Sequence, residues 1–441
     1  MLPRLTTLFL LLAVAVAWVG CDGTDEEVEP AETLPLGQFI AESVRLNTLE
    51  AALRQAGLLN EDNSTPLNNV TVFAPEDAAF TSMNTLTGGF VDALLGDADA
   101  LTAILQYHVV DGRILSSDLQ DGATVTTLAG EQLTIREVNG TFFVDGAPIT
   151  LPDAELPDAV VHRVGQVLTG SLNIVEFALL SPNFSTLVTA LANTGDSDEA
   201  GDDDLVTTLS GDGPFTVLAP SNAAFTTLPF DTGLLLEDER RPTLSNVLTY
   251  HVVPGVVFSD ELPATAGTAN GASVTFDGAT VDGIAIVATD LRLSNGVLHV
   301  IEGVLLGGAS IAQRVEVDPN FSTLESALGD TGLIGTFEGT DPFTVFAPTD
   351  AAFAAFEQDN GPLPTGDALR DVLLYHVLEG SFPTNSFLFG DMPMTLLGDP
   401  LLITFEAGSM IVNGITVEAP NVFASNGTIH AIGGVLLPPA P

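Results

Sequence analysis

Tyrosine and histidine stand side by side at three places in this chain, each time followed by valine. These tripeptides are Tyr107-His108-Val109, Tyr250-His251-Val252 and Tyr375-His376-Val377. They use all three tyrosines and half of the six histidines of the 441 residues. One further histidine follows each pair along the chain: His162, His299 and His430. A histidine beside a phenol could serve as a general base, and two histidines per copy could bind zinc together with carboxylates.

The residues before each pair favour a third interpretation, in which the histidine belongs to the core. In the second copy Leu244, Val247 and Leu248 recur at helical spacing, and His251 falls on the same apolar stripe. The histidines are therefore predicted to point inward at a helix end, where an imidazole can bond carbonyls that the helix leaves unpaired. A general base must face its substrate, and a short metal-binding spacing such as His-x-x-x-His is absent. We interpret all three tyrosines and six histidines as structural, and expect no enzyme and no catalytic, cofactor or metal site.

The Tyr-His pairs belong to a longer unit that occurs three times, with four blocks in the same order. The first block is a helix with N-caps expected at Asn47, Ser185 and Ser322, the last forming a capping box with Glu325. Three further blocks follow: a short strand that ends in Ala-Pro, the helix that ends at Tyr-His, and a closing strand around the second histidine. The closing strand is expected to be central in copies two and three, and nearer an edge in copy one, where Arg163 lies on one face. Helices early and strands late predict an α+β unit.

The shared motifs resemble those of the fasciclin domain family. They are Thr344-Val-Phe-Ala-Pro348, Tyr250-His-Val-Val253 and Asn295-Gly-Val-Leu-His-Val-Ile301. The resemblance divides the chain into three fasciclin-like domains at residues 34–170, 171–308 and 309–441. It implies that each domain is a small β wedge packed with several helices, and that the protein acts in cell adhesion or attachment to extracellular matrix. The family has no common enzymatic chemistry.

Residues 1–21 resemble an export signal that ends at the only cysteine. Arg4 precedes an apolar run from Leu5 to Val19, which is short for a membrane span of about 20 residues. Cys21 resembles the lipidated cysteine of a bacterial lipoprotein, although Trp18 stands where leucine is usual, and a plain secretory peptide is the alternative. Residues 22–33 are typical of an acidic, solvated tether. We expect an exported protein that is lipid-anchored at the cell surface or in the periplasm, or is secreted.

The chain is strongly acidic: 58 Asp and Glu stand against 11 basic residues, none of them lysine, and the formal net charge is -47. Such a surface repels nucleic acid and anionic lipid head groups, so we expect no nucleic-acid partner and membrane contact only through the lipid anchor. It suggests a salt-rich habitat, where the Debye length falls to about 3 Å at 1 M. An acidic insertion in the second copy is weakly suited to calcium, because it lacks the spacing of a calcium-binding loop. Its candidate ligands are Asp196, Asp198, Asp202, Asp203 and Asp204.

These observations predict an adhesion protein of the cell surface or extracellular matrix. Weak binding sites on linked domains would together bind a partner more firmly than any one of them alone, because one bound site raises the effective concentration of the others. The expected partners are matrix, polysaccharide, neighbouring cells or further copies of the same chain. The alternative function is an extracytoplasmic array of domains that binds a small ligand or a polysaccharide in a groove.

Overall fold

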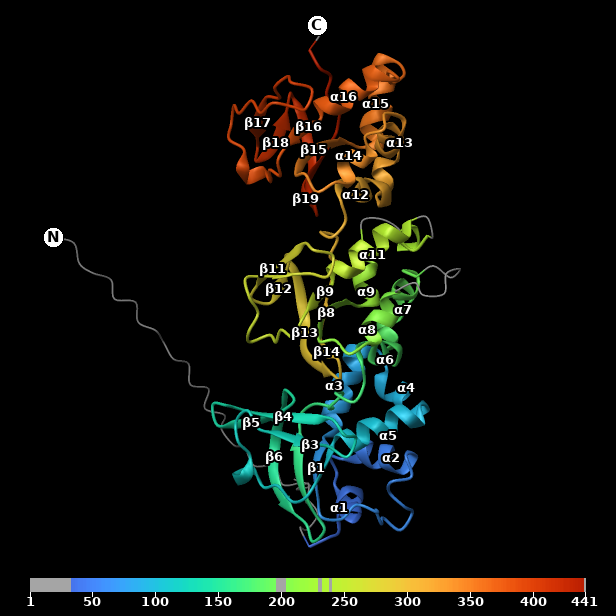
Figure 1. The fold of residues 1–441 in the computed structure, drawn as a ribbon, viewed down its shortest axis with the longest axis vertical. Helices are drawn as coiled ribbons and strands as arrows, with labels where there is room; N and C mark the ends of the chain where they lie inside the picture. Colours follow the sequence, from blue (N-terminus) through green and yellow to red (C-terminus); the bar gives the residue numbers. More distant parts are fainter. Residues whose placement is uncertain (1–32, 196–203, 229–231, 238–239, 440–441) are drawn as a thin grey trace, which may run out of the picture.

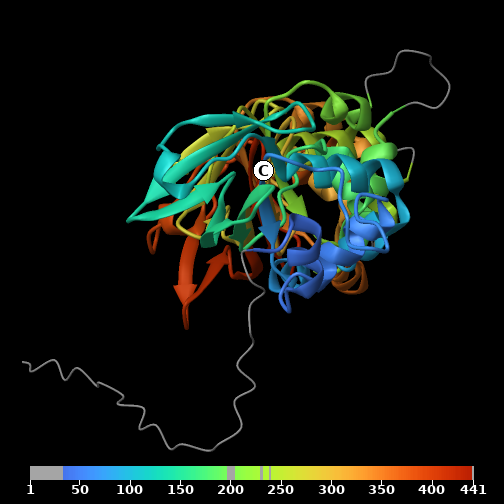
Figure 2. The same ribbon diagram turned by 90° about the horizontal axis from the view of Figure 1, so that it is seen from below.

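The computed structural model describes residues 33–195, 204–228, 232–237 and 240–439, and within them the chain forms three β-sheets with helices around each. We call the part from α1 to β7 domain 1, from α6 to β14 domain 2, and from α12 to β20 domain 3. The three domains follow one another along the long axis of the molecule (Figure 1). The sheets gather on one side and the helices on the other, as the view from below also shows (Figure 2). This is the predicted α+β architecture.

Domain 1 has a seven-stranded sheet in the order β2-β1-β7-β6-β5-β4-β3. Its helices are α1 (Leu36–Glu42), α2 (Asn47–Gln55), α3 (Asp77–Thr87), α4 (Phe90–Gly96) and α5 (Ala98–Tyr107). Its strands are β1 (Val70–Pro75), β2 (Val109–Asp111), β3 (Thr124–Thr126), β4 (Gln132–Val138), β5 (Thr141–Val144), β6 (Ala147–Glu155) and β7 (Ala159–Val164). The first and last long strands, β1 and β7, are parallel, so the domain closes by bringing its two ends together.

Domain 2 repeats this order as β9-β8-β14-β13-β12-β11-β10. Its helices are α6 (Ile174–Leu179), the 3-10 turn η2 (Pro182–Phe184), α7 (Ser185–Ala192), α8 (Leu205–Ser210), α9 (Asn222–Phe225), α10 (Thr232–Leu235) and α11 (Arg241–Tyr250). Its strands are β8 (Phe215–Pro220), β9 (Val252–Pro254), β10 (Thr265–Gly267), β11 (Ser273–Asp277), β12 (Thr280–Val281), β13 (Ile284–Leu293) and β14 (Gly296–Ile301). Strands β8 and β14 form the central parallel pair.

Domain 3 has six strands in the order β16-β15-β20-β19-β18-β17. Its helices are α12 (Ile311–Val317), the 3-10 turn η4 (Pro319–Phe321), α13 (Ser322–Asp330), α14 (Ile334–Glu338), α15 (Asp350–Asn360) and α16 (Asp367–Tyr375). Its strands are β15 (Phe343–Pro348), β16 (Val377–Glu379), β17 (Ile403–Glu406), β18 (Ser409–Val412), β19 (Ile415–Ala424) and β20 (Gly427–Ile432). Strands β15 and β20 pair in parallel, as in the other domains.

The closing strands β14 and β20 are central, as predicted, but the expectation that β7 lies near an edge was wrong. Strand β7 lies between β1 and β6, and its residues are buried on both faces. Arg163 is only 4% exposed, and its Nη1 lies 3.7 Å from Oε1 of Glu76. The ion pair with Glu76, the residue after β1, therefore compensates the buried charge of an arginine in a central strand. The polarity of the arginine side chain alone had indicated an edge strand.

The predicted N-caps at Asn47, Ser185 and Ser322 were also wrong. Each of these residues is the first residue of its helix. The residue before it makes no side-chain cap, and no capping box forms. The first-turn N–H groups are instead bonded by the side chain that opens the helix after the Ala-Pro strand. These bonds run from Thr48 N–H to Asp77 Oδ1 at 2.7 Å, from Thr186 N–H to Asn222 Oδ1 at 2.9 Å, and from Thr323 N–H to Asp350 Oδ1 at 2.8 Å. The cap is thus a tertiary contact between two helices.

Domains 1 and 2 share one hydrophobic core on the helical side. The rings of Phe90 in α4 and Phe177 in α6 are fully buried, with centroids 5.2 Å apart across the junction. Polar contacts flank this core: Asn183 Nδ2 donates to Leu86 O at 2.9 Å. Domain 3 adds Val317 to the shared core, while its own helical core is a separate cluster. No helix in the described ranges is long and apolar enough to cross a membrane.

We expect this arrangement to give two thermal transitions, one for domains 1 and 2 together and one for domain 3. A shared core couples two domains because neither can unfold without exposing apolar surface of the other. Differential scanning calorimetry of the full chain and of a chain ending before residue 309 measures this, since the shorter chain should keep only the first transition. A Phe90→Ala variant should shift the shared transition alone. Three separate transitions would contradict the shared core.

Candidate functional site

The histidine of each Tyr-His pair lies at the carboxyl end of a helix and points into the core. His108, His251 and His376 follow the last residues of α5, α11 and α16, and are 3%, 2% and 2% exposed. In domain 3, Nδ1 of His376 lies 2.7 Å from Val372 O, and Nε2 accepts the N–H of Leu436 at 2.9 Å. The same two bonds join Ile104 and Leu168 to His108, and Val247 and Leu305 to His251.

These bonds place the proton on Nδ1 and leave Nε2 as an acceptor, because a backbone N–H can only donate and a carbonyl can only accept. Burial lowers the pKa of His108, His251 and His376 to about 4 in each case. The rings are therefore neutral at pH 7, and both nitrogens are held by the backbone. Each imidazole joins the end of its helix to the segment that follows the closing strand.

The second histidine of each copy lies in the closing strand and is also enclosed. His162, His299 and His430 are each 0% exposed. Their Nε2 atoms lie 2.9 Å from the carbonyl oxygens of Ile114, Val257 and Phe382, and their Nδ1 atoms accept the N–H groups of Asp153, Asp290 and Asn421 at 3.2 Å. Burial lowers the pKa of His162 and His430. All six imidazoles are thus bonded to backbone through both nitrogens.

Each tyrosine bonds to a residue at the turn before β6, β13 or β19, and this partner was not predicted. The Tyr107 hydroxyl donates to Asp145 Oδ2 at 2.5 Å, and the Tyr250 hydroxyl donates to Asp282 Oδ2 at 2.7 Å. In domain 3, Asn413 Nδ2 donates to the Tyr375 hydroxyl oxygen at 2.9 Å. Burial and the adjacent carboxylate raise the pKa of Tyr107 and Tyr250. The repeated sequence Val-Asp-Gly or Val-Asn-Gly at these turns is a signal that could have identified them.

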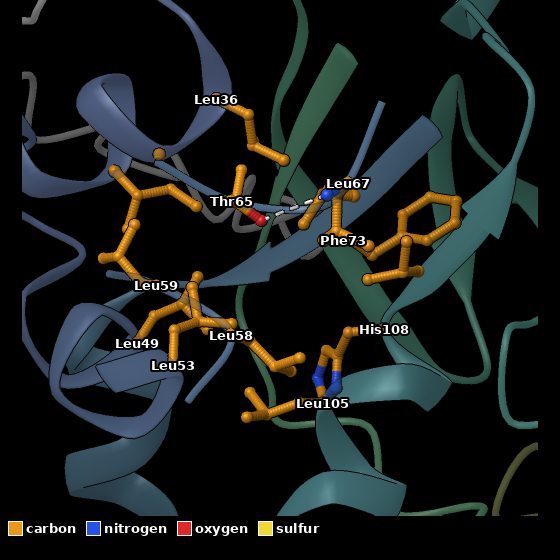
Figure 3. Close-up of a pocket in the computed structure, with 14 residues that line it drawn as sticks. Leu36, Leu49, Leu53, Leu58, Leu59, Thr65, Leu67, Phe73, Leu105 and His108 are labelled. Atoms are coloured by element: carbon orange, nitrogen blue, oxygen red, sulfur yellow. Dashed lines mark hydrogen bonds between the residues drawn. The ribbon is translucent and has the colours of Figure 1, made fainter. Parts of the chain in front are cut away.

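The cavity beside His108 is too small for a ligand. It lies among the side chains of α1, α2, β1 and α5, with leucines on most sides (Figure 3). Its volume is about 20 Å³, close to the space of one water molecule. Ligand pockets usually enclose about 300–1,000 Å³. This cavity is therefore no groove of the kind that the alternative function requires, and a larger cleft that Tyr107 lines, of about 400 Å³, lies at the junction with domain 2.

A more distinctive surface lies in domain 3, in the turn between the 3-10 helix η5 (Thr384–Ser386) and β17. Four large apolar side chains are open to solvent there: Leu388 is 71% exposed, Phe389 74%, Met392 60% and Met394 57%. We call these four residues the apolar loop. Single exposed apolar residues are common on proteins, but several large ones within one turn are typical of an interaction surface.

The fold does not require apolar residues in this turn, because domain 1 has the same turn with polar ones. Gly122 N–H bonds to Ile135 O, and Gly390 N–H bonds to Ile403 O, each at 2.8–2.9 Å, so the two turns share their backbone pattern. The positions of the apolar loop are occupied in domain 1 by Gln120, Asp121, Thr124 and Thr126, all exposed. The difference was not found from the sequence, although Phe387-Leu-Phe-Gly-Asp-Met-Pro-Met394 is an unusually apolar run for a turn.

The remaining candidates lie mostly outside the described residues. Cys21 is one of them, and so are four of the five calcium candidates, Asp196, Asp198, Asp202 and Asp203. The fifth, Asp204, caps helix α8, where its Oδ1 accepts the N–H of Thr207 at 2.6 Å. Among the residues that the structure describes, no three His, Cys, Asp or Glu side chains are grouped so that they could hold a metal ion.

Comparisons with known proteins agree with this architecture. The fasciclin domain profile matches residues 44–170, 182–307 and 319–438. Transforming growth factor-beta-induced protein ig-h3 of Sus scrofa is 30% identical over 242 residues, which are 52% of this chain and 35% of that protein. Protein sll1483 of Synechocystis is 41% identical over 150 residues, which are 32% of this chain and 78% of that protein. The chain thus matches only about a third of ig-h3.

A solved fasciclin domain pair, from the insect cell adhesion molecule fasciclin I, covers 51% of this chain and 88% of its own, with 22% identity and a TM-score of 0.29. Periostin of Homo sapiens is 29% identical over 242 residues, 52% of this chain and 29% of that protein. Fasciclin domains are associated with cell-adhesion and extracellular-matrix proteins. Because the profile matches most of the chain, in three successive segments, the chain belongs to the fasciclin domain family and contains three fasciclin domains in tandem.

Proposed function

We propose that this protein is an extracellular adhesion protein that holds to matrix or to neighbouring cells through weak, non-covalent contacts. The observation that carries the proposal is the apolar loop of domain 3. Its four side chains are on the surface of a chain with a net charge of -47, where water-exposed apolar residues contribute nothing to solubility. A partner that covers them gains roughly 1.5–3 kcal/mol for each side chain that becomes fully buried.

The charge of the chain defines the kind of partner that we propose. An acidic surface favours a partner that is cationic or uncharged around an apolar patch, and it disfavours other polyanions unless calcium or high salt screens them. Export and a lipid anchor at Cys21 would display many copies on one surface. Many weak contacts between two such surfaces then act together, because each contact formed raises the effective concentration of the next.

Beads that carry the chain from residue 22 to 441 test this proposal. We expect these beads to clump or to adhere to a matrix-coated surface in high salt. Adhesion should fall at least about tenfold in a variant of the apolar loop that carries Leu388→Gln, Phe389→Asp, Met392→Thr and Met394→Thr. The variant places in domain 3 the residues of the domain 1 turn, so the melting temperature of domain 3 should change little. A calcium-free series shows whether calcium bridges acidic surfaces.

Adhesion by the variant equal to that of the natural chain would remove the apolar loop from the proposal. Beads that neither clump nor adhere under any of these salt and calcium conditions would overturn adhesion itself. The matched control is a variant with Thr124→Ala and Thr126→Ala in domain 1, which changes the equivalent turn without an apolar loop and should adhere normally.

A further inference from the structure

The junction between domains 2 and 3 contains a cleft of about 790 Å³, which is within the usual size of ligand sites. Domain 2 lines it mainly with residues of β11, β12 and the turns around them, and domain 3 lines it with the end of β19 and the residue after it, 421–425, and with Arg314 of α12. Helix α12 of domain 3 also bonds to α11 of domain 2 across this junction. Thr243 Oγ1 donates to Glu316 Oε2 at 2.8 Å, and Asn246 Nδ2 donates to Gln313 Oε1 at 3.1 Å.

Arg314 of α12 lines the cleft with an incompletely bonded guanidinium group. Its Nε and Nη1 atoms are buried from solvent and have no hydrogen-bond partner. Burial lowers the pKa of Arg314 to about 10, which still leaves the group charged at pH 7. Leaving charged N–H groups both dry and unbonded is costly, and a carboxylate is the acceptor that a guanidinium group favours.

The junction between domains 1 and 2 shows how the same fold neutralises an arginine. There Arg292 of β13 lies over the ring of Phe258, 4.1 Å from its centroid, and its Nη1 lies 3.6 Å from Asp145 Oδ1. The helix position equivalent to Arg314 is the fully buried Phe177. At the second junction the two residue types are exchanged: Phe423 replaces Arg292 on the strand, and Arg314 replaces Phe177 on the helix.

This exchange leaves the second cleft with a cation and an open aromatic ring. Phe423 is 57% exposed and lines the cleft. The acid that corresponds to Asp145 is Asp282, which accepts the Tyr250 hydroxyl and the Thr275 N–H just as Asp145 accepts the Tyr107 hydroxyl and the Thr134 N–H. Asp277 is the other carboxylate of the lining, and Ser273, Thr275 and Ser425 bring hydroxyl groups to it.

We propose that this cleft binds an acidic sugar, with the carboxylate of a uronic acid on Arg314 and a sugar ring against Phe423. An aromatic face and several hydroxyl groups suit a ring with hydroxyls on its edge and C–H groups on its face. One guanidinium in a cleft that Asp277 also lines, on a chain with net charge -47, suits a ligand with a single isolated carboxylate rather than a polyanion. The inference concerns a second site and does not depend on the apolar loop.

The test uses the chain from residue 22 to 441 and a trisaccharide that contains one glucuronic acid, titrated in a calorimeter in high salt. The neutral trisaccharide with glucose in place of glucuronic acid should bind about tenfold or more weakly, because it cannot bond the charged guanidinium. Arg314→Gln should weaken binding of the acidic trisaccharide by about the same factor. Phe423→Ser, at an exposed position, should weaken the binding of both sugars.

Two controls separate this site from the rest of the molecule. Arg292→Gln, at the first junction, and the apolar-loop variant should both bind the acidic trisaccharide normally. No binding by the natural chain, equal binding of the two trisaccharides, or normal binding by a folded Arg314→Gln chain would each overturn the proposal. Equal affinity for acetyl-trialanine, which has one carboxylate and no sugar ring, would also overturn it by assigning the cleft to peptide.

Discussion

Replacing His376 by alanine should lower the free energy of unfolding of domain 3 by about 3 kcal/mol. The change removes a ring that is 2% exposed and bonds both Val372 O and Leu436 N–H. A methyl group reaches neither partner, so two buried backbone groups lose their bonds, at about 1–3 kcal/mol for each group that stays dry. The space left by the ring adds a cavity cost. Urea unfolding that follows the domain 3 transition measures the change.

The control for this prediction is Asp371→Ala, an exposed change on the same helix, which should alter the stability of domain 3 by no more than about 0.5 kcal/mol. His251→Ala should act in the same way on the shared transition of domains 1 and 2 and leave domain 3 unchanged. A His376→Ala chain with the stability of the natural protein would show that water or a rearranged helix end replaces the imidazole bonds.

Much of the fold could be predicted because the chain presents the same pattern three times. Helical spacing placed His108, His251 and His376 on apolar stripes, and the structure buries all three at helix ends. The apolar runs of β14 and β20 indicated central strands, since only a strand covered on both faces is apolar throughout. These features depend on local spacing and on the burial of side chains, which a single sequence records directly.

The features that were missed depend on contacts between distant segments. The helix caps at Asp77, Asn222 and Asp350 come from the helix after the Ala-Pro strand, so the local residue before each capped helix did not reveal them. Arg163 led to the prediction of an edge strand, because its contact with Glu76 does not show in the sequence. The bonds from Tyr107 and Tyr250 to aspartates in a distant turn were missed for the same reason.

The two candidate sites were missed for a different reason, because they are departures from the repeat. The apolar loop and the exchange of Phe423 for Arg292 are recognised as departures when equivalent positions of the domains are aligned through shared backbone bonds and strand register. Motifs common to all copies report the requirements of the fold. Positions where one copy departs from the others, at exposed or incompletely bonded side chains, are therefore better guides to function in a tandem protein.

Acidification should destabilise all three domains between pH 6.5 and about 4. His108, His251 and His376 have pKa values of about 4 in the folded chain and an ordinary value of 6.5 when unfolded. Between these values the unfolded chain binds protons that the folded chain does not, so the free energy of unfolding falls as the pH falls. Each histidine accounts for roughly 3 kcal/mol across this window, and above pH 6.5 its contribution is constant.

The distribution of the histidines makes this loss unequal. Two of them, His108 and His251, belong to the unit formed by domains 1 and 2, and His376 belongs to domain 3. Between pH 7 and pH 4.5 these three histidines should therefore cost the shared transition about twice as much free energy as the domain 3 transition, roughly 5 against 2.5 kcal/mol, and His162 and His430 add one further loss to each. Calorimetry over this range in molar salt measures both, and the salt limits the effect of carboxylate repulsion. Equal losses, or stability that rises on acidification to pH 5, would mean that the carboxylates of this acidic chain outweigh its buried imidazoles.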